Sequence, residues 1–149
     1  MRHVKGNTMF ECLIVGDGIA AGLAELRPEC KTYSKEGLSS QKWNKEFMKK
    51  TPLIAKRVII SLGSYDHFYV FTETELRVLR KLTEADKVYW VLPAGNDPKF
   101  QVDISKTQKI IRRIAEENED IVLPITRTED DGMTPNDNGY KMLADRIKK

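Results

Sequence analysis

Five short apolar runs, separated by segments with helical patterning, constrain the fold of this chain more than any other feature. The runs are rich in β-branched and aromatic residues, and each is about five to seven residues long, as expected for strands buried on both faces of a sheet. They are FECLIVG (10–16), CKTYS (30–34), RVIISLG (57–63), KVYWVLP (87–93) and DIVLPI (120–125).

The segments between the runs carry apolar residues at helical spacing. Two of them open with a residue pair at capping-box spacing, Thr72 with Glu75 and Ser105 with Gln108, which predicts where those helices begin. A strand and a helix therefore alternate about five times. This order predicts a three-layer α/β/α sandwich around a parallel sheet of about five strands, with right-handed crossovers and a flavodoxin-like arrangement.

The chain of 149 residues has the size of one domain and contains no internal repeat or linker. We expect a polar N-terminal leader at 1–8 and a single domain at 9–149. Cys12 and Cys30 lie in or beside apolar runs without metal-like spacing, so we expect small buried thiols and no disulfide framework.

Glycine and aspartate recur directly after the predicted strands. In open parallel sheets, ligands bind at the carboxyl ends of the strands, so these loops are the candidate site. Glycine there indicates a tight turn or a close backbone approach. The loops are Gly16-Asp17-Gly18, residues 34–37, residues 63–67, Ala94-Gly95-Asn96-Asp97 and residues 130–136.

Together these loops resemble the conserved blocks of the SGNH (GDSL-like) hydrolases. GDG at 16–18 stands where that family has GDS, and YSKEGLSS offers Gly37 for its second block. LGSYD at 62–66 corresponds to G-x-N-D, and DGMTPNDNGY at 131–140 corresponds to the block that contains D-x-x-H. The chain also resembles small SGNH proteins encoded by bacteriophages of marine bacteria. The resemblance implies the SGNH hydrolase fold over nearly the whole chain.

The resemblance also implies where an ester-hydrolysing site would lie. In the family, a serine nucleophile is activated by a histidine that an aspartate orients, and an oxyanion hole includes an asparagine side chain. Carried onto this sequence, the serine position is Gly18, the asparagine position is Tyr65 and the histidine position is Thr134. The scaffold residues Gly37, Gly63 and Asp131 remain. Because glycine and threonine supply neither nucleophile nor base, we predict a catalytically inactive member, a pseudoenzyme.

Other polar residues of these loops are candidates for lining the vestigial pocket. One alternative is an active hydrolase with relocated groups, in which Ser64 and His67 replace the lost pair. Three residues apart on one loop, their side chains cannot easily converge with a third, orienting acid. The pocket-lining candidates are Asp17, Ser64, Asp66, His67 and Asn96.

A second alternative is nucleotide binding by GDGIAA at 16–21. The segment satisfies G-x-G-x-x-A between a strand and a helix, and Glu36 lies 20 residues beyond Gly16. This two-glycine pattern leaves the block at 131–140 unexplained. Four loop aspartates, at 17, 66, 97 and 131, could hold a hard cation, but aspartates in such loops commonly cap helices or form Asx turns. We predict no metal and no cofactor.

The charges are nearly balanced, with 25 basic and 22 acidic residues and a formal net charge of +3, which argues against a nucleic-acid partner. No apolar stretch approaches the ~20 residues of a membrane span, and no signal peptide is recognisable. We expect a cytoplasmic protein, or one in a phage virion or its host's cytoplasm. Its expected role is binding or assembly, through a protein partner or self-association, with a small ligand in the vestigial pocket.

Overall fold

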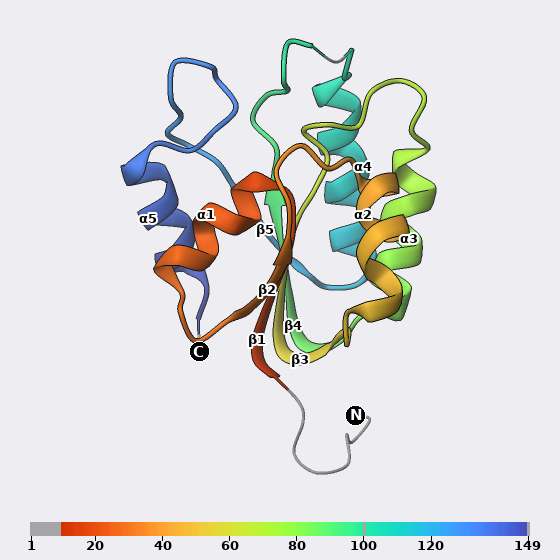
Figure 1. The fold of residues 1–149 in the computed structure, drawn as a ribbon, viewed down its shortest axis with the longest axis vertical. Coiled ribbons are helices and arrows are strands. Elements are labelled where there is room, and N and C mark those ends of the chain that lie inside the picture. Colours follow the sequence, from red (N-terminus) through yellow and green to blue (C-terminus); the bar gives the residue numbers. More distant parts are fainter. Residues whose placement is uncertain (1–9, 100, 149) are drawn as a thin grey trace.

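The computed structural model describes residues 10–99 and 101–148, so the predicted leader at 1–8 lies outside the described residues. Strands and helices alternate five times, as the sequence predicts (Figure 1). The strands are β1 (Phe10–Gly16), β2 (Lys31–Ser34), β3 (Ile54–Ser61), β4 (Glu84–Leu92) and β5 (Ile121–Pro124). The helices are α1 (Gly18–Leu26), α2 (Ser40–Phe47), the 3-10 turn η1 (Met48–Lys50), α3 (Thr72–Leu82), α4 (Ile104–Glu117) and α5 (Asp137–Arg146).

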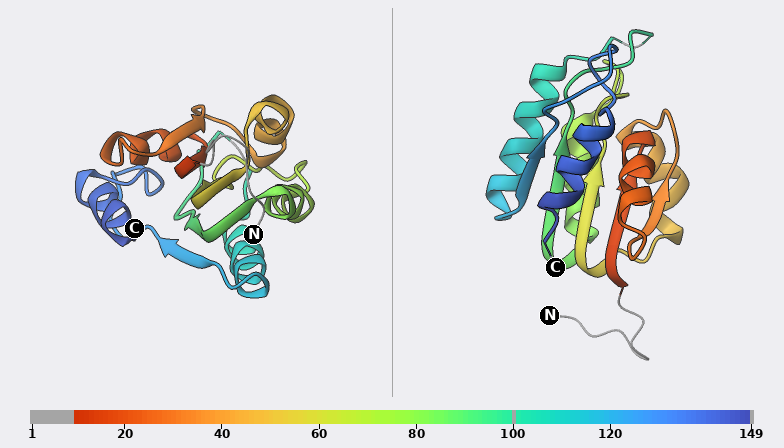
Figure 2. Two further views of the ribbon diagram at one scale, coloured as in Figure 1. Left: turned by 90° about the horizontal axis from the view of Figure 1, so that it is seen from below. Right: turned by 90° about the vertical axis from the view of Figure 1, so that its left-hand side faces the viewer.

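All five strands are parallel and stand in the order β2-β1-β3-β4-β5, which is the flavodoxin-like order. Helices α1 and α5 cover one face of the sheet, and α2, α3 and α4 cover the other (Figures 1 and 2). The predicted three-layer α/β/α fold is confirmed. Strand order reverses between β1 and β3, so the loops after these two strands lie at the switch point where such sheets bind ligands.

One apolar cluster fills each face of the sheet. Trp43, Leu76 and Ile111 pack from α2, α3 and α4 on one face, and Leu23 and Leu143 pack from α1 and α5 on the other. The central strands are buried on both faces, as expected. The edge strands β2 and β5 are partly exposed, and here the expectation of full burial is wrong. The composition of an apolar run does not indicate whether the strand will lie at the centre or at the edge of the sheet.

The two predicted capping boxes do not form. Helix α3 has no side-chain cap, and the Thr72 hydroxyl instead donates to Asp66 at 2.8 Å. With Ser105 as its N-cap, helix α4 would begin at residue 106. It instead begins two residues earlier, at Ile104. Its N-cap is Asp103, which accepts from the Lys106 amide at 3.0 Å. Thr72 thus bonds to a buried carboxylate instead of capping α3, and Asp103 caps α4 in place of Ser105.

The expectation of free thiols is wrong, because Cys12 and Cys30 form a disulfide. Leu13 of β1 pairs with Lys31 of β2, and this register sets the two preceding cysteines side by side. Both side chains are buried, as predicted. The bond ties β1 to the turn before β2 across a separation of 18 residues, which sequence spacing alone did not reveal. No helix of the described part of the chain is long and apolar enough to cross a membrane.

Candidate functional site at the carboxyl edge of the sheet

The loops that follow β3, β4 and β5 lie together at the top of Figure 1, above the carboxyl ends of the strands. The switch point is held by backbone contacts. Gly16 has φ +144°, and a side chain there would overlap the backbone of Ser61, so β1 and β3 approach more closely than any other residue would allow. The Asp17 amide donates to the Ser61 carbonyl at 3.0 Å, which fixes the start of α1.

Asp17 lies beneath this edge, with only 1% of its surface exposed. Its Oδ1 accepts from the Ile19 amide at 3.0 Å and from the Ser61 hydroxyl at 3.3 Å, so the side chain caps α1. Its Oδ2 is buried with no hydrogen-bond partner among the described residues. Burial therefore raises the pKa of Asp17 to about 7, despite the hydrogen bonds that favour its charged form.

Gly18, at the position of the family's nucleophile, is covered by the side chain of Glu36. A Cβ atom on Gly18 would collide with the Glu36 carboxylate. The same carboxylate accepts from the Tyr65 hydroxyl at 3.4 Å. Gly37, next to Glu36, has φ +79° and open space around its Cα. The Glu36 side chain therefore occupies the space in which a serine side chain would stand.

Tyr65, at the position of the oxyanion asparagine, is buried. Burial, followed by the charges of Glu36, Asp17 and Asp97, raises its pKa well above the usual range. Its hydroxyl is protonated at neutral pH and donates toward Glu36. A hydrogen bond thus joins Tyr65 to the exposed Glu36 side chain beside Gly18.

Asp66 follows Tyr65 but serves the fold. Its carboxylate accepts from the Ser40 amide at 2.7 Å, the Ser40 hydroxyl at 2.5 Å and the Thr72 hydroxyl at 2.8 Å, which ties the starts of α2 and α3 together. Gly63, earlier in this loop, has φ +124°, and a Cβ atom there would lie 2.8 Å from the Thr107 side chain. These residues position the loop, and Asp66 and Thr72 also line a cavity beside it.

The proposed substitute pair, Ser64 and His67, is split between the interior and the surface. Ser64 is 1% exposed. The His67 ring lies in an exposed arm, where its Nδ1 accepts from the Tyr69 amide at 3.3 Å and its ring stands edge-on to Tyr69. This arrangement gives Ser64 no access to a substrate in solution.

Asp131 and Thr134 form a self-contained turn beyond β5. Asp131 accepts from the amides of Met133 and Thr134 at 2.9 Å each, and from the Thr134 hydroxyl at 2.8 Å. These bonds, the Met133 amide first, lower the pKa of Asp131. The aspartate that would orient a histidine is thus satisfied by its own loop.

The turn at Asp131 touches the loop after β4. A Cβ atom on Gly95 would lie 2.5 Å from the carbonyl oxygen of Gly132, so these loops meet through their backbones. The Asn96 side chain donates to the Asp97 carbonyl at 3.0 Å. The loops after β4 and β5 therefore meet as one unit, in which the side-chain hydrogen bond of Thr134 goes to Asp131.

Carboxylates dominate the electrostatics of this edge. The pKa of Tyr140, whose ring lies against Gly22, rises to about 12 through burial first and then through the charges of Asp17 and Glu36. Within residues 10–99 and 101–148, no Lys or Arg forms an ion pair with the carboxylates at 17, 36, 97 and 131. No group of three or more His, Cys, Asp or Glu side chains that could hold a metal occurs among the residues described.

No protein-family model matches the sequence, and no curated protein matches it. Solved structures do match. A candidate acylhydrolase from Bacteroides fragilis aligns with a TM-score of 0.66 and 14% identity over 97% of this chain and 86% of its own. A candidate lipolytic protein of the G-D-S-L family from Desulfitobacterium hafniense aligns with a TM-score of 0.63 and 14% identity over 91% and 96%. The fold is SGNH-like. At this identity the likeness concerns the fold alone.

Within this SGNH-like fold, the structure brings Gly18, Glu36 and Tyr65 together and leaves Thr134 bonded to Asp131. In the sequence, Glu36 stood out only by its distance of 20 residues from Gly16 in the nucleotide-binding alternative, and Tyr140 was not singled out. The one available signal for Tyr140 was its place at the end of DGMTPNDNGY, whose last four residues begin α5. For Glu36, the signal was its position beside Gly37.

Proposed function

We propose that this chain is a catalytically inactive SGNH hydrolase-like protein that keeps the fold for a binding or structural role. The observation that carries the proposal is the Glu36 carboxylate over Gly18. It fills the space of the missing nucleophile, and it places a negative charge where acyl transfer develops an oxyanion. Such a charge raises the energy of the transition state instead of lowering it.

The other departures support the same proposal. The Tyr65 hydroxyl donates to Glu36, so it is engaged by a carboxylate of the chain itself. Thr134 carries no group that accepts a proton near neutral pH, and its hydroxyl donates to Asp131. Nucleophile, oxyanion donor and base are lost together, and loss of triad members costs several powers of ten in rate.

Neither alternative gains a favourable observation. A hydrolase using Ser64 would need a reactive hydroxyl that is instead buried. A nucleotide would need an open helix start at GDGIAA, where Asp17 caps the Ile19 amide and Glu36 covers Gly18. Two carboxyl groups at a helix N-terminus occupy the place where phosphate would bind.

Covalent labelling tests the proposed inactivity. The folded protein is incubated with a fluorophosphonate, and its intact mass is measured, with an active SGNH esterase as the labelled control. We expect no serine to react. An adduct on Ser64, mapped by peptide sequencing and absent in Ser64→Ala, would show a relocated nucleophile and overturn the proposal.

We further propose that the role is one of assembly, as a phage virion component (capsid decoration or tail-associated) or as an accessory protein in the host cytoplasm. The test is the native mass of the purified chain together with its presence in purified particles. An oligomer, or a chain that co-purifies with particles, supports the proposal. A 17.1 kDa monomer that is absent from particles contradicts an assembly role, in the virion or in the host cytoplasm.

The disulfide bears on the proposed location, because cytosolic reductants keep most thiols reduced. Cells are lysed into an alkylating agent, and the state of Cys12 and Cys30 is read from the intact mass. Alkylated cysteines would fit the host cytoplasm. A protected disulfide in freshly lysed cells would place the chain in an oxidising setting instead.

A further inference from the structure

The loop after β3 carries an exposed aromatic arm, which we define as residues 67–71 (HFYVF). Phe68, Tyr69 and Phe71 are exposed to 66%, 69% and 75% of their surface. The other exposed large apolar side chains of the described residues are aliphatic and lie on helices α1 and α3 or on the edge strand β5. Three large aromatic rings within four residues form a patch, and a contiguous apolar patch on a soluble protein indicates a binding site.

The aromatic arm is ordered by its own contacts. The rings of Phe68 and Tyr69 lie 4.0 Å apart between centroids, and the His67 ring meets Tyr69 edge-on at 5.2 Å. The Val70 amide donates to the His67 carbonyl at 2.9 Å, and the Val70 side chain is buried as an anchor. The rings are therefore held in place before any ligand arrives, which lowers the entropic cost of binding.

Two cavities flank the aromatic arm, and both are lined by His67 and Phe68. One, of about 510 Å³, lies between the arm and the first turns of α3 and α4, and includes Phe71 and Ile110. The other, of about 500 Å³, lies on the side of Tyr69. A chain-like ligand that crosses Phe68 reaches both cavities at once.

The charged side chains around these cavities include both signs without an excess of cations. Asp66, Glu73 and Asp103 line the first cavity with Lys106, and Lys99 lines the second with Gln101. Three acidic groups against two basic ones give no net attraction for a polyanion such as nucleic acid or an anionic lipid surface. The rim instead supplies donors from lysine, acceptors from the carboxylates, and both from the Gln101 amide.

We propose that the aromatic arm and its two flanking cavities bind a neutral oligosaccharide. A pyranose ring has an apolar face that can lie on Phe68, and hydroxyls that both donate and accept hydrogen bonds. The ligand needs no net charge, requires mixed polar partners and extends across both cavities. Gly18 lines neither cavity, and this site does not depend on the function proposed for the chain.

Calorimetric titration tests the proposal with four neutral hexasaccharides: cellohexaose, xylohexaose, maltohexaose and chitohexaose. We expect at least one to bind with a Kd below about 1 mM. Phe68→Ala should weaken that binding by at least about tenfold, since aromatic contacts dominate such interfaces. Leu82→Ala is the matched control, because Leu82 is an exposed apolar residue of α3 outside both cavities, and its variant should bind like the parent.

Phe68 is exposed, so its variant should keep the parent's melting temperature, which is measured alongside. Absence of binding to all four hexasaccharides overturns the proposal. So does binding that Phe68→Ala leaves unchanged. A decathymidine strand and phosphatidylglycerol vesicles are run in parallel, and Phe68-dependent binding to either, without sugar binding, would assign the arm to that ligand instead.

Discussion

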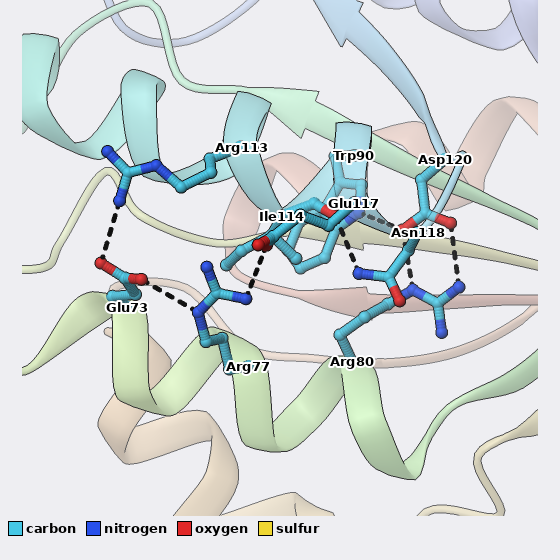
Figure 3. A network of polar contacts seen from close by, with 9 residues as sticks. All are labelled: Glu73, Arg77, Arg80, Trp90, Arg113, Ile114, Glu117, Asn118 and Asp120. Atoms are coloured by element: carbon cyan, nitrogen blue, oxygen red, sulfur yellow. Dashed lines mark hydrogen bonds and ion pairs between the residues drawn. The ribbon is translucent and has the colours of Figure 1, made fainter.

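Two groups of charged residues, at different places in the fold, differ in whether their carboxylates are paired with cations. Between α3 and α4, acidic and basic side chains pair repeatedly (Figure 3). Asp120 accepts from two nitrogens of Arg80, at 2.7 and 2.9 Å, and from the Trp90 indole at 2.9 Å. Further out, Glu73, Arg77, Arg113 and Glu117 continue the network.

At the carboxyl edge of the sheet, carboxylates gather without cations. Glu36 is bonded by a neutral tyrosine hydroxyl, and Asp17 keeps one buried oxygen without a partner. Burial therefore penalises the charge of Asp17, which raises its pKa to about 7. Asp120, nearly as buried, has each oxygen bonded.

The paired network stabilises α3 against α4. At the carboxyl edge, Asp17 caps α1 but has a raised pKa and a buried oxygen without a partner among the described residues. Perturbed groups of this kind commonly mark functional sites. Three substitutions measure this contrast directly.

Asp120→Ala should have the largest effect. It leaves the half-buried Arg80 guanidinium and the Trp90 indole without their acceptor, and breaking a buried pair costs about 3–5 kcal/mol. Urea denaturation followed by circular dichroism measures the loss. Glu117→Ala removes an exposed partner of the same network and should cost less than about 1 kcal/mol. If both variants lost the same free energy of unfolding, the Asp120 pair would contribute no more than an exposed ion pair.

Asp17→Asn should change how stability depends on pH. The folded-state pKa of Asp17, about 7, lies above the ordinary aspartate value of 3.8, so the unfolded chain gives up this proton first as the pH rises. The parent therefore loses stability between about pH 4 and pH 7, and the variant, which cannot titrate there, does not. Relative to the parent, the variant should gain about 2–4 kcal/mol across this window.

Urea denaturation at the two ends of that window gives the difference. Asp131→Asn is the control, because the pKa of Asp131 is lowered, so its contribution to stability is present above the usual aspartate pKa and is lost as the pH falls. A constant difference between Asp17→Asn and the parent at all pH values would contradict the assignment of a buried, largely uncharged Asp17.

Gly18→Ala should have the smallest effect on the free energy of unfolding. The informative quantity is the coupling between this substitution and a change at Glu36. Alanine favours helix formation, but its Cβ must displace the Glu36 carboxylate. The change should therefore be more favourable in a Glu36→Ala background, with a coupling of about 0.5–1 kcal/mol in a double-mutant cycle. Strict additivity would mean that Glu36 does not occupy the space over Gly18.

The fold was predictable because its signals are local and repeated. The β-branched and aromatic composition of apolar runs such as RVIISLG and KVYWVLP predicts strands. The alternation of these runs with helical segments predicts that the strands are parallel. Cap positions were less predictable, since Thr72 turned to a carboxylate six residues away. The disulfide depended on the register between β1 and β2, which no spacing encodes.

The candidate site was predictable only as a set of loops. The lost nucleophile, oxyanion donor and base could be located by position, at Gly18, Tyr65 and Thr134. The side chain that fills the nucleophile's space could not be predicted. The place of Glu36 over Gly18 depends on a side-chain direction next to the turn at Gly37. The burial of Asp17, likewise, follows from the close approach of β1 and β3.

Hydrolysis of short-chain p-nitrophenyl esters tests the central claim most directly. The folded chain is compared with Gly18→Ala and with the heat-unfolded chain, and an active SGNH esterase serves as the positive control. The account predicts that all three preparations of this chain release p-nitrophenol at the same background rate. Turnover by the folded chain well above that of the unfolded chain would contradict it, whether or not Gly18→Ala lowers the rate.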